Sequence, residues 1–209
     1  VSNEPYLVFA SNAFAILGLR ALYFALAGFA IALLSPPLGA IADRTGRQKL
    51  WLGLFTVLAA LLVALLWFVT PSPDAVTLAL IGIALATIAF EIECIFYNAL
   101  LPSVAPTTHV GRVSGWGWGA GYLGGIVCLG LILVLFIDRD PPWLGLDVAQ
   151  AEQVRIAAPL SALWHLVFAI PLFALVHEAP GPPIRPLAAL RRVFLRGGLR
   201  MRLRVVLAA

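Results

Sequence analysis

The sequence predicts an all-α integral membrane protein with five to six transmembrane helices. Of its 209 residues, 62% are hydrophobic and only 11% are charged, whereas soluble domains carry about 25% charged residues. The apolar residues form runs of about 20, the length that a helix needs to cross a bilayer core. Cationic residues gather in alternate connections between these runs. A water-soluble core could not bury so much apolar surface, so lipid must surround most of the chain.

Five apolar runs have the length of a span, and they cover residues 21–41, 50–69, 76–101, 114–137 and 156–176. Within hydrocarbon, each backbone polar group needs a partner inside the protein, which predicts that these runs are helices. Strands of a membrane barrel would alternate apolar and polar residues, and these runs do not alternate.

The N-terminal run, residues 6–17, is apolar but too short to cross. Only Gly18, Leu19 and Arg20 separate it from the next run, and two full spans need about 40 residues. Three interpretations stay open: a truncated first helix, one long helix broken near Gly18, or a signal peptide. The last lacks a basic start and a clear cleavage site.

The connections between the spans predict the orientation, because Lys and Arg are enriched in short cytoplasmic loops. Residues 42–49 and 102–113 carry cationic side chains, as does the Arg-rich segment 179–209 that follows the bundle of residues 1–178. Residues 70–75 carry none, and residues 138–155 are acidic on balance. We therefore expect the first three on the cytoplasmic side and the last two outside.

Residues 39–49 hold a patterned set of glycines and charges that anchoring alone does not explain. The glycines permit a tight turn and close helix approach, and an Asp beside two Arg can hold a loop in one shape. The loop resembles the signature cytoplasmic loop of the major facilitator superfamily, where it acts as a gating element. Its patterned positions are Gly39, Asp43, Arg44, Gly46, Arg47 and Lys49.

Two further stretches, FEIECIFYNALLP (90–102) and GRVSGWGWGAGYLGG (111–125), resemble one branch of that superfamily. This branch contains the autophagy-linked vacuolar amino-acid effluxers and their bacterial relatives. FASNAF (9–14) resembles a degenerate copy of the branch's first-helix motif. The matching positions are Glu91, Phe96, Tyr97, Asn98, Ala99, Leu101, Pro102, Gly111, Arg112, Ser114 and Gly115.

The resemblance implies a multi-pass protein of a bacterial inner membrane that moves a small polar solute, such as an amino acid, by alternating access. Such transporters have two six-helix bundles with the solute site between them, and this sequence resembles the N-terminal bundle. Expected partners are membrane lipid, the solute, and a C-terminal six-helix half or a second copy. The alternative is a truncated, non-transporting membrane fragment or interaction module.

The candidate transport residues lie in the run 76–101. An ionised carboxylate at the bilayer centre costs at least about 2.5 kcal/mol, so Glu91 and Glu93 must be protonated, paired or facing water. Glu91 and Asn98 share one helical face and could line one cavity, while Glu93 and Tyr97 share another. Glu91 is the stronger candidate for a coupling proton, although it could equally form a structural hydrogen bond. Glu93 ranks lower, because the resembling branch usually has a small apolar residue there.

Six glycines of the run 111–125 form two helical stripes, a spacing that permits close contact between membrane helices. The stripes are Gly111, Gly115 and Gly119, and Gly117, Gly121 and Gly125. We expect them to serve helix packing and sliding. A phosphate-binding loop would need a preceding strand and solvent.

Other polar residues predict little further chemistry. His165 lies inside the last run, where a lone histidine more often bonds a neighbouring helix than relays protons. Cys94 and Cys128 fall in apolar runs and are expected to be buried thiols. We expect no enzyme activity, cofactor or metal, because no set of His, Cys and acidic residues has ligand spacing. The Arg-rich segment could be a cytoplasmic linker, a lipid-bound segment or out-of-frame sequence, and nucleic-acid binding is not expected.

Overall fold

The computed structural model describes residues 4–45, 47–106, 108–139, 141 and 143–177, with the backbone alone for residues 4–16 and 40–45. The Arg-rich segment 179–209 lies outside the described residues. Within them the chain is helical, without a strand. Five helical segments are long and apolar enough to cross a membrane, at residues 17–39, 48–68, 75–104, 110–137 and 152–175.

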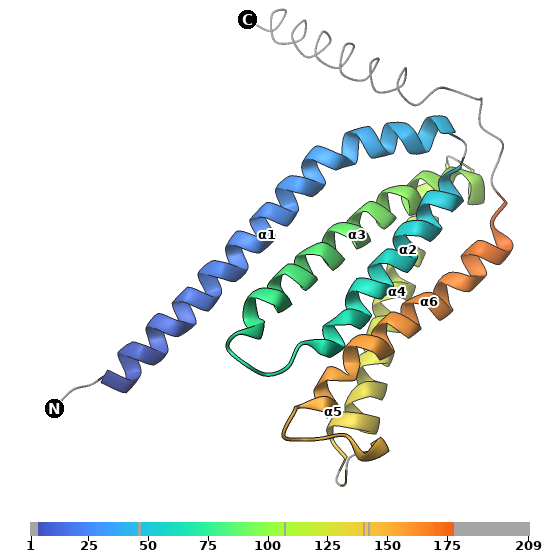
Figure 1. Cartoon of the computed structure of the whole chain (residues 1–209). Coiled ribbons are helices and arrows are strands. Elements are labelled where there is room, and N and C mark those ends of the chain that lie inside the picture. Colours follow the sequence, from blue (N-terminus) through green and yellow to red (C-terminus); the bar gives the residue numbers. More distant parts are fainter. Residues whose placement is uncertain (1–3, 46, 107, 140, 142, 178–209) are drawn as a thin grey trace, which may run out of the picture.

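Successive long helices run antiparallel and form one bundle (Figure 1). Helix α1 covers Glu4–Thr45, α2 Gln48–Leu65, α3 Ala75–Val104, α4 Val110–Ile132 and α6 Ala157–Leu175. A 3-10 turn, η1 (Leu66–Phe68), extends α2, and a π-helical turn, η2 (Leu133–Ile137), extends α4. The connection from α4 to α6 contains a 3-10 turn, η3 (Trp143–Gly145), and the short helix α5 (Glu152–Arg155).

Of the interpretations left open for the N-terminal run, the structure shows one long helix that is continuous with the next run. It has no break near Gly18, and residues 6–17 are not a separate truncated helix. Helix α1 has 42 residues, about 63 Å at 1.5 Å per residue, which is longer than the hydrocarbon core. A glycine costs only about 1 kcal/mol relative to alanine in a helix, and the flanking Ala and Leu residues favour the helix. Helix α1 instead bends toward its C-terminal end (Figure 1), where Pro36 and Pro37 remove backbone donors.

The patterned segment 39–49 is mostly helical, so the predicted eight-residue loop at 42–49 is wrong. Helix α1 continues to Thr45 and α2 begins at Gln48. Charged residues do not end a helix by themselves, and within residues 42–49 glycine, which has a low helix propensity, occurs once, at position 46. The connection between the two spans therefore consists of residues 46 and 47.

The core of the bundle lies between α2 and α3, with α6 against it. Phe96 is completely buried and lies near Trp51 and Phe55, with ring centroids 6.0 and 5.9 Å away and near-parallel planes. The side chains packed around it include Leu52, Ile92 and Leu100 from α2 and α3, and Leu172 and Phe173 from α6. Phe96, a residue of the resembling motif, thus holds three helices together.

Charged side chains fasten the two ends of the bundle. At one end, Lys49 Nζ donates to the carbonyls of Phe173 and Val176, at 2.8 and 2.7 Å, where α6 ends. At the other end, the Arg155 guanidinium donates to the Trp67 carbonyl and lies 5.0 Å from the centroid of the Trp67 ring. Both contacts place a cation at the C-terminal end of a helix, where its dipole is negative.

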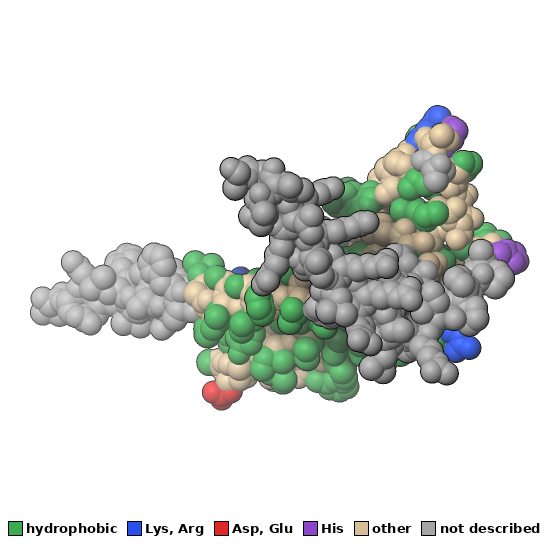
Figure 2. Space-filling model, turned by 90° about the horizontal axis from the view of Figure 1, so that it is seen from above, with side chains coloured by type: hydrophobic (Ala, Val, Ile, Leu, Met, Phe, Trp, Pro, Cys, Tyr) green, Lys and Arg blue, Asp and Glu red, His purple; other side chains and the backbone are tan. Residues whose placement is uncertain are grey.

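The flanks of the bundle are apolar and open. Large hydrophobic side chains are exposed on every long helix, including Phe29 (70%), Leu123 (64%) and Phe168 (62%). Figure 2 looks down on one end of the molecule and shows many hydrophobic side chains on its described part, with charged and His side chains at the margins. Soluble monomers do not expose apolar surface on this scale, which agrees with a lipid-facing exterior.

Candidate functional site: polar residues inside the bundle

Three polar side chains from three helices meet near the middle of the bundle. Glu93 of α3 is 8% exposed. Its Oε1 accepts a hydrogen bond from Thr56 Oγ1 of α2 at 2.8 Å, and its Oε2 lies 3.1 Å from His165 Nε2 of α6. We call these residues the Glu93 cluster. His165 therefore bonds a neighbouring helix, as its position in a span predicted.

The helices bring the cluster together because each residue projects from the core-facing side of its helix. Thr56 lies one turn after Leu52, and its hydroxyl is also 2.9 Å from the Leu52 carbonyl oxygen. Glu93 follows Ile92 and precedes Phe96, both buried in the core. The contacts that close the core thus also hold the carboxylate at a depth where water is scarce.

A cavity of about 350 Å³ adjoins the cluster between α2, α3 and α6. Most of its lining is apolar, and its polar members are Thr87, Ser161 and His165. The Phe90 ring lies edge-on to the His165 ring, with centroids 6.2 Å apart. His165 is one third exposed, whereas Glu93 is nearly covered. The His165 imidazole therefore lies between the cavity and the Glu93 carboxylate.

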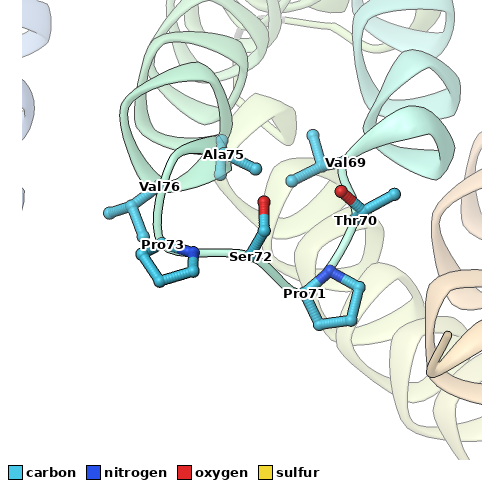
Figure 3. Close-up of a pocket in the computed structure, with 8 residues that line it drawn as sticks. Val69, Thr70, Pro71, Ser72, Pro73, Ala75 and Val76 are labelled. Carbon is cyan, nitrogen blue, oxygen red and sulfur yellow. The ribbon is translucent and has the colours of Figure 1, made fainter. Parts of the chain in front are cut away.

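A second hollow, of about 300 Å³, lies at the turn between α2 and α3. Figure 3 shows Pro71, Ser72 and Pro73 of this turn at its edge. Its lining residues include no ionisable side chain. This hollow therefore offers no group for proton or ion chemistry.

Glu91 and Asn98, the predicted pair on one face of α3, are both exposed. Ile95, between them on this face, lies against Gly39 of α1: a Cβ built on Gly39 would be 3.9 Å from Ile95 Cγ2. Among the described residues, the Glu91 carboxylate has no hydrogen-bond or ion-pair partner. The described side chains therefore leave Glu91 and Asn98 exposed on either side of this contact with α1, and we call these two positions the open face of α3.

Tyr97 points toward α4. A Cβ built on Gly117 would lie 2.8 Å from the Tyr97 hydroxyl oxygen, so this glycine permits the close approach of α3 and α4. Of the two predicted stripes, Gly117 alone shows such a contact among the described residues. A Cβ would meet nothing within 4 Å at the other five positions, Gly111, Gly115, Gly119, Gly121 and Gly125. Packing among the described residues does not use these five glycines, because α4 lies at the edge of the bundle (Figure 1).

The patterned segment is only partly visible at the level of side chains. Gly39 and Lys49 make the contacts given above, and Arg47 is exposed. The side chains of Asp43 and Arg44, and Gly46, lie outside the described residues.

Among the described residues, no group of three His, Cys, Asp or Glu side chains could hold a metal ion.

Sequence reasoning missed Thr56, Gly53 and Gly82. A Cβ on Gly53 would lie 3.3 Å from the Phe173 ring, and one on Gly82 would lie 2.8 Å from Leu66 Cδ2. Isolated glycines and a single threonine in apolar spans carry no spacing signal. Only the neighbouring helix shows what each of them contacts.

A bundle of spanning helices with ionisable groups at mid-depth is typical of membrane transport proteins. The family model described as Major Facilitator Superfamily matches residues 6–129, and the one described as Vacuole effluxer Atg22 like matches residues 106–201. The chain belongs to the major facilitator superfamily. Its resemblance to the vacuolar effluxer branch is confirmed over the second range.

Among curated proteins, the chain is similar to the "Uncharacterized MFS-type transporter YxiO" of Bacillus subtilis (strain 168). The two are 30% identical over 154 residues, which cover 74% of this chain and 35% of the relative. No solved structure matches the chain. Family membership and the five apolar helices identify the chain as a multi-pass membrane protein of a transporter family.

Proposed function

We propose that the chain works as a bundle of a secondary transporter that moves a small polar solute, such as an amino acid, by alternating access. Family membership supports transport, and similarity to the vacuole effluxer family supports efflux of a small solute. The bacterial relative supports a location in a bacterial inner membrane. The chain spans 35% of the relative's length, so a second bundle would complete the solute site.

The observation that carries the proposal is the open face of α3 with Glu91 and Asn98. A carboxylate exposed to lipid at mid-depth costs at least about 2.5 kcal/mol. The cost falls if the face borders a water-filled solute pathway instead. Since both side chains can hydrogen-bond a polar solute, this face fits the wall of a pathway shared with a C-terminal six-helix half or a second copy.

The segment 39–49 would then gate the cytoplasmic end of the pathway. Lys49 already ties the start of α2 to the end of α6. Rigid-body rocking of one bundle against another keeps such internal contacts intact while the pathway opens and closes.

Flux measurements test the proposal. The chain is reconstituted into vesicles, and the movement of radiolabelled amino acids is followed with and without a proton gradient. We expect solute flux above that of empty vesicles, strongly reduced by Glu91→Gln and unchanged by Asp74→Asn. Asp74 is the matched control, because it lies in the turn before α3 rather than on the open face.

The same experiment addresses the alternative. Flux equal to that of empty vesicles under every gradient would reject transport by this chain alone, and would favour the alternative, a truncated, non-transporting membrane fragment or interaction module. Equal flux for the wild type and Glu91→Gln would remove Glu91 from the solute pathway.

A further inference from the structure

In the Glu93 cluster, the single hydroxyl proton of Thr56 has two possible acceptors. The Thr56 hydroxyl has one proton, yet its oxygen lies 2.8 Å from Glu93 Oε1 and 2.9 Å from the Leu52 carbonyl oxygen. If Glu93 is ionised, Thr56 donates to the carboxylate. If Glu93 is protonated on Oε1, the acid donates to Thr56, which then donates to Leu52. The site therefore satisfies both protonation states of Glu93 without moving a helix.

The contact with His165 has the same property. Its Nε2 lies 3.1 Å from Glu93 Oε2, so a neutral or charged imidazole can donate to the carboxylate. A carboxylic acid can in turn donate to an unprotonated Nε2. A proton can therefore reside on either side of this contact, and the pair can lose or gain one proton while staying hydrogen-bonded.

Few other ionisable groups face this pair. Helix α2 contributes the uncharged Thr56, and α6 contributes His165. On α3 itself the titratable neighbours are Glu91, Cys94 and Tyr97, of which Tyr97 points toward α4. Among the residues of α1 and α4 whose side chains are described, Arg20 and Arg112 are the charged ones, and neither forms an ion pair with the cluster. The charge of Glu93 is thus balanced mainly by the proton it shares with His165.

The lining of the cavity extends from His165 toward one end of the bundle. Its lining comes from the C-terminal half of α2 and the N-terminal halves of α3 and α6, which lead to the turns at the acidic end of the bundle. The three helices run side by side in Figure 1. The Thr87 and Ser161 hydroxyls offer partners for water in a space large enough to hold it.

We propose that Glu93 and His165 form the proton-binding site of the transporter, reached from the outer side through this cavity. A hydronium ion gives its proton to the imidazole, and the Nε2 proton passes to Oε2. The products are water, a neutral imidazole and a carboxylic acid, so charge and protons balance. This proposal rests on the proposed transport function for its role, but proton binding itself can be measured without flux.

Ring NMR of the chain, labelled with ¹⁵N-histidine in lipid nanodiscs, tests proton binding. His109 and His177 lie in connections outside the helices and serve as internal references, and His165→Gln assigns the third signal. We expect Glu93→Gln to move the titration midpoint of His165 by about one pH unit or more, since a charge at this distance has such effects. The matched variant Glu91→Gln leaves the midpoint in place. Equal midpoints for His165 in wild type and Glu93→Gln would overturn the proposal.

Two additions keep the test decisive. If Glu93→Gln does not fold, Thr56→Ala removes the hydroxyl that accommodates both protonation states of Glu93, and it must also move the titration midpoint of His165.

A second variant tests the route through the cavity. Ser161→Leu fills the cavity and is expected to slow exchange of the His165 ring proton with water. Leu163→Phe, on the exposed side of α6, is its control. Equal exchange rates in both variants would contradict the route through the cavity.

A flux measurement separates the coupling role from transport itself. In vesicles, Glu93→Gln and His165→Gln should retain exchange of solute across the membrane and lose accumulation driven by a proton gradient. Gradient-driven accumulation at the wild-type level would overturn the coupling role. If wild-type vesicles show no flux above that of empty vesicles, transport by this chain alone is rejected. The NMR result would still decide whether Glu93 and His165 bind a proton.

Discussion

At the scale of single residues, the ionisable groups of α3 divide according to the helix face that carries them. Glu93 faces α2 and α6 and is buried with two hydrogen-bond partners, whereas Glu91 is exposed. The two positions are about 200° apart around a helix of 3.6 residues per turn. The sequence favoured Glu91 as the proton carrier and did not reveal the partners of Glu93, because these partners are distant along the chain. Thr56 lies 37 positions away and His165 lies 72 positions away.

The contact between Tyr97 and Gly117 provides a test at this scale. Gly117→Ala places a methyl group 2.8 Å from the Tyr97 hydroxyl oxygen and should lower the free energy of unfolding by about 1 kcal/mol through overpacking. Removing the hydroxyl in Tyr97→Phe should relieve the overlap and restore stability in the double variant. Unfolding in mixed micelles with rising dodecyl sulfate measures each value.

Gly121→Ala is the control for this cycle. It lies on the same helix with nothing within 4 Å of the added Cβ, so it should be neutral or stabilise α4 by up to about 1 kcal/mol. Equal losses at positions 117 and 121 would contradict the close approach.

At the scale of elements, the predicted and observed structures differ in the connections between the helices more than in the helices themselves. The five spans agree with the predicted runs to within a few residues, because their length is set by the hydrocarbon thickness. The connection at 42–49 shortened to residues 46 and 47, and the connection at 138–155 gained helix α5. Arg155 is one of two arginines in a connection that is acidic on balance. Its guanidinium donates to the Trp67 carbonyl and lies over the Trp67 ring.

Truncating Arg155 tests whether this contact holds the outer connection in place. Arg155→Ala removes a charge-assisted hydrogen bond that we expect to contribute about 1 kcal/mol here. Amide hydrogen exchange in residues 66–69 and 152–156 should then be roughly fivefold faster, since exchange reports local opening. Arg139→Ala is the control, because Arg139 lies over Trp143 of its own connection. Unchanged exchange in Arg155→Ala would show that the contact does not fasten α5.

At the scale of the whole molecule, the two ends of the bundle differ in their balance of charge. The turns from α1 to α2 and from α3 to α4, with Arg47, Lys49 and Arg112, lie at the end where α6 finishes (Figure 1). The turns at 69–74 and 138–151, with Asp74, Asp138 and Asp147, lie at the opposite end. This arrangement agrees with the alternation read from the loops and with the positive-inside rule.

Labelling in intact cells tests this orientation. Single cysteines replace Arg112 and Asp147 in a chain whose own thiols, Cys94 and Cys128, are changed to serine. We expect a membrane-impermeant maleimide to label position 147 from outside and position 112 only after the membrane is opened. Labelling of both positions from the same side would refute the proposed topology.

By itself, the sequence determined the fold class, the spans and their alternating direction. Lipid imposes a fixed span length and a closed backbone, and both are visible as runs of apolar residues. The tertiary structure alone decided that α1 is one continuous helix and that Phe96 holds the core. It also decided that Thr56, Glu93 and His165 meet beside a cavity. These features depend on which faces of distant helices touch, and because the helices are apolar all round, periodicity does not reveal those faces.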